Sequence, residues 1–109
     1  MGLMLSSING YEGRVELVGA RAVAGLFQRW SLRREVPGSD AWDLHAVLSY
    51  QKPNLLFHPK FKRRVMVKEH TSGVWYEVRL PEGQEPEING DDLNMKGAWL
   101  CRADQTGRP

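Results

Sequence analysis

The chain has 109 residues, the length of one domain, with 15 Lys and Arg against 13 Asp and Glu and a net charge of +2. Its 41% hydrophobic content, with four Trp, is too high for a disordered chain and fits a globular protein with one modest core. The single cysteine, Cys101, excludes an internal disulfide and a multi-cysteine zinc site and favours a reducing compartment. The first residues lack the pattern of a signal peptide, and no apolar run approaches the roughly 18 residues of a membrane span. A cytoplasmic protein without membrane contact is therefore expected.

The first third of the chain contains one clear strand and one ambiguous segment. Residues 14–18 alternate between polar and apolar side chains, which predicts a strand. Across residues 20–30 the apolar positions recur every three or four residues, and this spacing predicts an amphipathic helix, although Gly25 weakens it by about 1 kcal/mol. Residues 26–32 also alternate, so a strand is the competing prediction for this segment.

The middle of the chain is rich in strand patterns. Residues 42–50 alternate over nine positions, and a helix capped by Ser39 is the weaker alternative. Two further runs, 65–70 and 74–80, flank a turn at 71–73, which predicts a β-hairpin.

The last part of the chain is predicted to combine a loop, a strand and a helix. Residues 81–92 are polar and acidic, with two Pro and two Gly, and are expected to form a long loop. Residues 93–96 alternate as a strand, Gly97 breaks the pattern, and the apolar spacing over 98–103 predicts a short helix before a second turn at 106–107. The expected fold is α+β, with a mostly antiparallel sheet and one or two short helices.

A basic cluster stands at the start of the predicted hairpin. Phosphate contacts need several cations on one face, and aromatic rings offer stacking platforms for unpaired bases. On an extended segment Lys60, Lys62 and Arg64 share one face, whereas Phe61 and Arg63 share the other. The competing interpretation is a solvated edge strand, on which lysines guard against edge pairing. The predicted nucleic-acid-binding residues are Lys60, Lys62, Arg63, Arg64, Lys68 and Phe61, with Phe57 interleaved.

Other chemistry-bearing side chains show no recognisable arrangement. His45, His58 and His70 lack metal-ligand spacing and are expected to be surface or turn residues, although a general-base role stays open for His58 or His70 beside the cationic segment. The acidic residues within 82–92 lack the pattern of a calcium loop, and Cys101 has no base partner in the sequence. No metal or cofactor is expected, no catalytic residue can be assigned, and whether the protein is an enzyme stays open.

The C-terminal run resembles the SymE family of small bacterial toxins, which are built on an AbrB-like swapped-hairpin fold. Members carry a strand followed by Lys-Gly-x-Trp-Leu and an Ala-Gly-Phe step. The residues that fall on this pattern in register are Leu93, Met95, Lys96, Gly97, Trp99, Leu100, Ala103 and Gly107. Residues 63–67 are similar to the basic-apolar strand that opens the family's domain. The family's Gly-Phe is replaced here at 104–105, and the chain ends at Pro109 before the closing strands, which indicates a truncated member. The specific part of the match spans 93–107, and the match covers 63–109 of a single predicted domain when the basic-apolar strand is counted; residues 1–60 have no counterpart in the family.

What the resemblance implies is an action on nucleic acid. The family is usually described as cleaving RNA, and its AbrB-like relatives bind DNA, commonly as dimers. The predicted function is that of a SymE-like toxin that binds RNA or DNA, acts as an endoribonuclease and forms a homodimer, with residues 60–68 holding phosphates. The alternative is a non-enzymatic protein-interaction module, such as a phage or mobile-element accessory protein, that uses exposed Trp75 and Tyr76. A metal-dependent enzyme comes third, because no ligand set can be assembled.

Overall fold

The computed structural model describes residues 3–6 (backbone only), 12–19, 22–34, 36, 38–56, 58–70 and 72–103. Most of this part of the chain is β-strand, and its elements in chain order are β1 (Leu3–Ser6), β2 (Gly13–Leu17), β3 (Ala22–Arg34), β4 (Trp42–Gln51), α1 (Pro53–Leu56), β5 (Arg63–Lys68), β6 (Trp75–Arg79), β7 (Glu87–Asn89) and β8 (Asp92–Arg102).

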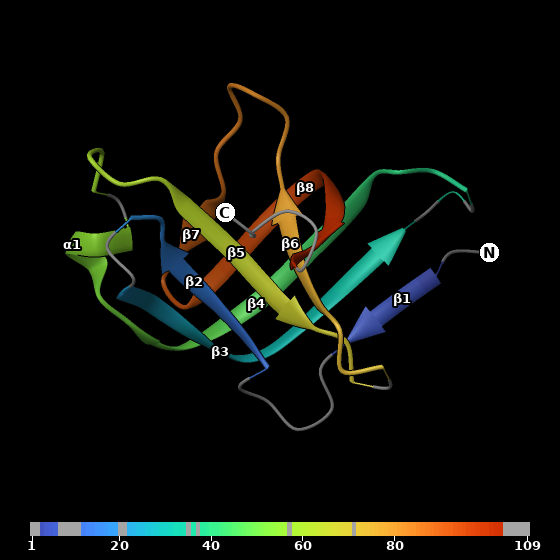
Figure 1. Ribbon diagram of the computed structural model, residues 1–109, viewed down its shortest axis with the longest axis horizontal. Helices are drawn as coiled ribbons and strands as arrows, with labels where there is room; N and C mark the ends of the chain where they lie inside the picture. The colour runs from blue at the N-terminus through green and yellow to red at the C-terminus, as the bar shows by residue number, and fades with distance from the viewer. Residues whose placement is uncertain are drawn as a thin grey trace.

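Six of the strands close into an antiparallel barrel (Figure 1). The order around the barrel is β2, β3, β4, β8, β6, β5 and back to β2. The barrel therefore combines two meanders, β2-β3-β4 and β5-β6-β8, and α1 lies in the connection between them. β1 extends the sheet beside β3, and β7 pairs with the start of β8. Closure protects the paired edges of the six strands from pairing with other chains.

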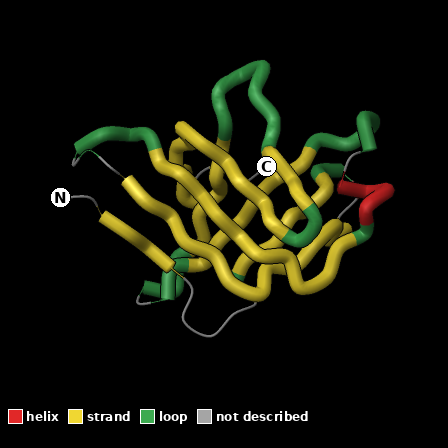
Figure 2. The backbone as a smooth tube through the Cα atoms, turned by 180° about the vertical axis from the view of Figure 1, so that it is seen from behind, coloured by secondary structure: helices red, strands yellow, loops and turns green. Residues whose placement is uncertain are grey.

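The core fills the inside of this barrel because alternate side chains of each strand point inward. β4 shows the pattern most clearly, since its buried and exposed residues alternate from Trp42 to Leu48. The short helix α1 lies at one end of the barrel (Figures 1 and 2), and its Leu56 is completely buried in the core. The buried cluster consists of Val15, Leu17, Ala24, Phe27, Trp30, Leu32, Trp42, Leu44, Ala46, Leu48, Leu56, Val65, Val67, Val78, Leu93, Met95 and Ala98.

The predicted helix over 20–30 is wrong, because residues 22–30 belong to β3; residues 20–21 lie outside the described residues. The register between β3 and β4 shifts twice near Phe27, and the register between β2 and β3 shifts once near Gly25. Each such bulge adds an unpaired residue and changes the phase of the inward side chains. Buried residues consequently fall three apart at Ala24, Phe27 and Trp30, which is the spacing of a helix face. The competing strand prediction was the correct one.

The predicted helix over 98–103 is also wrong, because β8 continues through Gly97 to Arg102. The loop predicted over 81–92 contains β7, and the turn predicted at 106–107 lies outside the described residues. The strands predicted at 14–18 and 42–50, and the hairpin that β5 and β6 form, are confirmed.

The antiparallel sheet of the predicted fold is confirmed, whereas the helical part is smaller than expected. Within the described ranges the only α-helix of a full turn is α1, so the domain is β-rich rather than clearly α+β. None of the helical structure in these ranges is long and apolar enough to cross a membrane.

Candidate functional site

A bulge in β8 decides which of its side chains face outward. Between the inward residues Met95 and Ala98, β8 advances three residues while the paired strand β4 advances two, so the alternation changes phase. Gly97 adopts a φ of 70°, a left-handed conformation that favours glycine, and its N–H donates a hydrogen bond to Asp43 Oδ1 at 3.1 Å. Trp99 would face the core in an uninterrupted strand; after the bulge it faces outward and is 38% exposed.

The outward residues of β2, β5, β6 and β8 form a continuous surface. Residues directly opposite each other on antiparallel strands point to the same side of a sheet. The cross-strand rows are Lys68 with Trp75; Arg14 with Met66, Glu77 and Cys101; Glu16 with Arg64; and Arg79 with Trp99. Lys62 precedes Arg64 by two residues, and its carbonyl continues the ladder by accepting the Val18 N–H at 2.8 Å. Glu12 extends the ladder at the other end, where its carbonyl accepts the Lys68 N–H at 2.8 Å. We call this surface the basic-aromatic face: the cations Arg14, Lys62, Arg64, Lys68 and Arg79, the aromatics Trp75 and Trp99, and the carboxylates Glu12, Glu16 and Glu77.

Two of the three carboxylates of the basic-aromatic face are engaged by arginines, and the third, Glu12, has its Oε1 3.9 Å from His70 Nδ1. Glu16 pairs with Arg14, whose guanidinium also lies 4.7 Å from the ring centre of Trp75 in a cation–π contact. Glu77 is 8% exposed, and its Oε1 lies 3.2 Å from Arg79 Nη2 and 3.8 Å from Arg64 Nε. The Glu77 carboxylate raises the pKa of the Arg79 guanidinium, which therefore stays charged at any ordinary pH. The face is thus left with an excess of positive charge.

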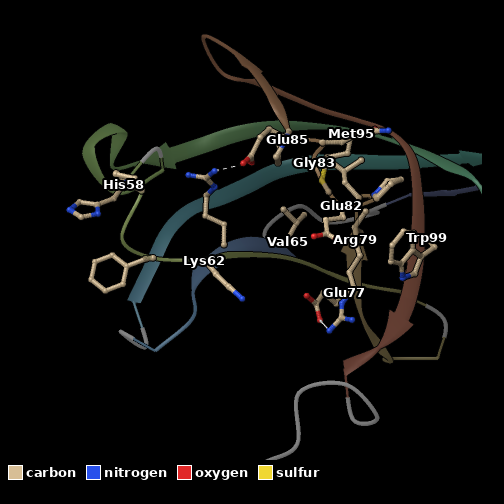
Figure 3. Close-up of a pocket in the computed structure, with 18 residues that line it drawn as sticks. His58, Lys62, Val65, Glu77, Arg79, Glu82, Gly83, Glu85, Met95 and Trp99 are labelled. Carbon is tan, nitrogen blue, oxygen red and sulfur yellow. Dashed lines mark hydrogen bonds and ion pairs between the residues drawn. The ribbon is translucent and has the colours of Figure 1, made fainter.

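A groove of about 890 Å³ adjoins the face beneath the loop of residues 80–86 (Figure 3). One edge of β8 pairs with β7 over residues 92–94 and with β6, which ends at Arg79, over residues 99–102. Between these two pairings, over residues 95–98, neither strand covers this edge. Lys62, Glu77, Arg79 and Trp99 of the face also line the groove, together with His58 and the loop carboxylates Glu82 and Glu85.

The predicted nucleic-acid-binding residues separate onto two sides of the sheet, as their alternation predicts. Lys62, Arg64 and Lys68 belong to the basic-aromatic face, and Lys60 is exposed in the turn before β5. Arg63 points the other way: its guanidinium donates to the Leu56 carbonyl and lies 3.1 Å from Glu85. Phe61 packs against the core, with its ring centre 5.1 Å from that of His58. Phe57 lies outside the described residues.

Each of the three histidines contacts a nearby backbone or carboxylate group. His58 Nδ1 accepts the Lys60 backbone N–H at 3.1 Å, so the neutral ring carries its proton on Nε2 and has no free lone pair for a general base. His45 Nε2 lies 3.0 Å from Asp92 Oδ1, and His70 Nδ1 lies 3.9 Å from Glu12 Oε1. No group of three or more His, Cys, Asp or Glu side chains within the described part of the chain could hold a metal ion.

Four of the cations and aromatics of the face are not among the predicted binding residues. Arg14, Trp75 and Arg79 join it through cross-strand pairing, and Trp99, expected in a helix, joins it through the bulge at Gly97. The alternation of residues 14–18 could have indicated that Arg14 faces outward, but the choice of neighbouring strands has no local signal.

Comparisons with known proteins return no match. No protein-family model matches the chain, and neither the curated proteins nor the solved structures contain a match to it. The chemistry of the basic-aromatic face and its groove therefore provides the basis for a functional assignment.

Proposed function

We propose that the protein binds nucleic acid through the basic-aromatic face. The proposal is carried by the cross-strand rows, which place five cations and two Trp on one side of the sheet against three carboxylates. Because Glu16 and Glu77 are already paired with arginines, they oppose an approaching phosphate less than free carboxylates would.

The arrangement of the cations suits a polyanion better than a single small anion. Lys62, just before β5, and Arg64 and Lys68 on β5 lie along one line on the outward side of the strand. Lys62 and Arg64 are about 6.6 Å apart along the chain, and Arg64 and Lys68 are about 13 Å apart. Arg14 and Arg79 extend this line across the flanking strands. Charges spread over a surface in this way neutralise successive phosphates, and each contact adds to the salt dependence of binding.

Binding is proposed here rather than cleavage. RNA cleavage, a toxin activity, homodimer formation and an AbrB-like ancestry of residues 63–109 are implied by the SymE resemblance and stay predictions. The alternative, a protein-interaction module, has less support at the aromatics first suggested for it. Trp75 is half-buried next to Arg14, and Tyr76 packs against the core.

A salt series with charge-matched variants tests the proposal. Binding of the intact chain to fluorescein-labelled DNA and RNA is followed by fluorescence anisotropy between about 50 and 200 mM salt. The double variant K62A/K68A removes two exposed or half-exposed cations of the face, and K52A/K96A removes two exposed cations elsewhere. We expect K62A/K68A to weaken binding roughly tenfold and to lower the salt slope by about 2, with K52A/K96A close to wild type. Absence of binding at the lowest salt, or equal losses in both double variants, would contradict the proposal.

A further inference from the structure

Trp99 separates two hollows of the molecular surface. On one side lies the groove of about 890 Å³ that it shares with Arg79 and Lys62. On the other lies a hollow of about 410 Å³ lined by Asp40, Trp42, Trp99 and Leu100. The indole is 38% exposed, although a Trp on a strand of a closed barrel can be buried among its neighbours, as Trp30 and Trp42 are.

The local structure that holds Trp99 in this position is built into the chain. The bulge at Gly97 turns Trp99 outward, and the pairing of β8 with β6 places it directly opposite Arg79. Bulges commonly re-aim a side chain next to a functional site. The result is an aromatic ring that stands beside a permanently charged guanidinium, with open space on either side.

We infer that Trp99 inserts between two consecutive bases of a single-stranded nucleic acid, with one base in each hollow and the intervening phosphate beside Arg79. This inference rests on the proposed function and specifies its ligand. Stacking on an aromatic ring requires a base whose face is free, and in a duplex both faces are covered by neighbouring base pairs. Every base has a π-face, so the contact is tolerant of sequence.

A ligand without bases separates stacking from phosphate binding. The probes are a fluorescein-labelled 12-mer of thymidine, a 12-mer of abasic sugar-phosphate with the same charge, and the corresponding 12-bp duplex. The variants are Trp99→Leu, which keeps an apolar side chain without a π-face, and Trp99→Phe, which keeps a smaller one. Tyr50→Leu is the matched control, because Tyr50 is an exposed aromatic of β4 outside both hollows. Thermal unfolding of each variant confirms that it is folded.

We expect the thymidine strand to bind at least tenfold more tightly than the abasic strand, and more tightly than the duplex. Trp99→Leu should lose roughly tenfold in affinity for the thymidine strand and should bind the abasic strand as wild type does. The affinity of Trp99→Phe for the thymidine strand should lie between those of Trp99→Leu and wild type, and that of Tyr50→Leu should be unchanged. Equal binding of thymidine and abasic strands, equal or tighter binding of the duplex, or an unaltered Trp99→Leu would overturn the inference while leaving phosphate binding in place. Absence of binding to all three probes would instead remove the proposed function itself.

Discussion

Asp43 of β4 accepts a hydrogen bond from the Gly97 N–H of β8 at 3.1 Å, at the point where β8 gains one residue over its partner strand. This side chain therefore satisfies a backbone donor that the irregular ladder leaves without its usual partner. The contact fixes the change of phase in β8. Upstream of it Met95 is buried, and downstream Ala98 is buried while Trp99 faces outward.

Replacing Gly97 by alanine should lower the free energy of unfolding by about 1–2 kcal/mol, because a φ of 70° is unfavourable for residues with a Cβ. No heavy atom lies within 4 Å of the position that the new Cβ would take, so the cost is backbone strain rather than a clash. Urea unfolding measures the change. Gly97→Asn serves as the control, since asparagine tolerates this conformation better and should cost less. A Gly97→Ala protein as stable as wild type would show that the bulge does not require a left-handed residue.

The alternation of inward and outward side chains along each strand explains which elements could be predicted from the sequence. β2 alternates along its whole length and β4 alternates from Trp42 to Leu48, so the patterns at 14–18 and 42–50 were sufficient to find them. β3 and β8 contain bulges, and a bulge turns a spacing of two into a spacing of three that resembles a helix. In β8 the glycine at position 97 signals the bulge in the sequence. In β3 the unpaired residue next to Phe27 is Gln28, and a glutamine gives no such signal.

The candidate site could be predicted only where it follows a single strand. Lys62, Arg64 and Lys68 share a face because they are an even number of residues apart on one segment, and alternation alone places them together. Arg14 and Arg79 reach the same face through the order and register of the strands, which depend on tertiary packing.

At Gly13 the backbone approaches a side chain too closely for a residue with a Cβ. A Cβ built on Gly13 would lie 2.3 Å from Cδ2 of the buried Phe27 ring. Gly13→Ala should therefore destabilise the protein by about 1–3 kcal/mol through overpacking. A double-mutant cycle with Phe27→Leu, measured by urea unfolding, checks the cause. The alanine should cost much less in the Phe27→Leu background than in wild type, and an equal cost in both backgrounds would show that the ring is not responsible.

Leu56 holds α1 against the end of the barrel. The helix has four residues and is too short to be stable alone, so its position depends on this completely buried side chain. Leu56→Ala should lower the free energy of unfolding by about 2–5 kcal/mol. The neighbouring Leu55 is partly exposed, and Leu55→Ala provides a matched control with a smaller expected loss. Similar losses for the two variants would contradict the assignment of Leu56 as the anchor.

Loop carboxylates should restrain nucleic-acid binding in the groove. Glu82 and Glu85 line the groove, and Glu85 also forms an exposed ion pair with Arg63 at 3.1 Å. The double variant E82Q/E85Q removes two negative charges that repel phosphate, so it should bind single strands roughly two- to fivefold more tightly at about 50 mM salt and approach wild type as salt screens the repulsion. Its stability should change by less than about 1 kcal/mol, because the Glu85 side chain is 73% exposed.

The control for this prediction is E87Q/D91N, which removes the same charge from exposed positions around the β7–β8 turn that do not line the groove. Fluorescence anisotropy across the salt series compares the two double variants. If they tighten binding equally, net charge rather than the position of the loop carboxylates sets the affinity. If neither double variant changes the affinity, the bound nucleic acid does not pass beneath the loop of residues 80–86. Its phosphates then contact only the outward side chains of β2, β5 and β6.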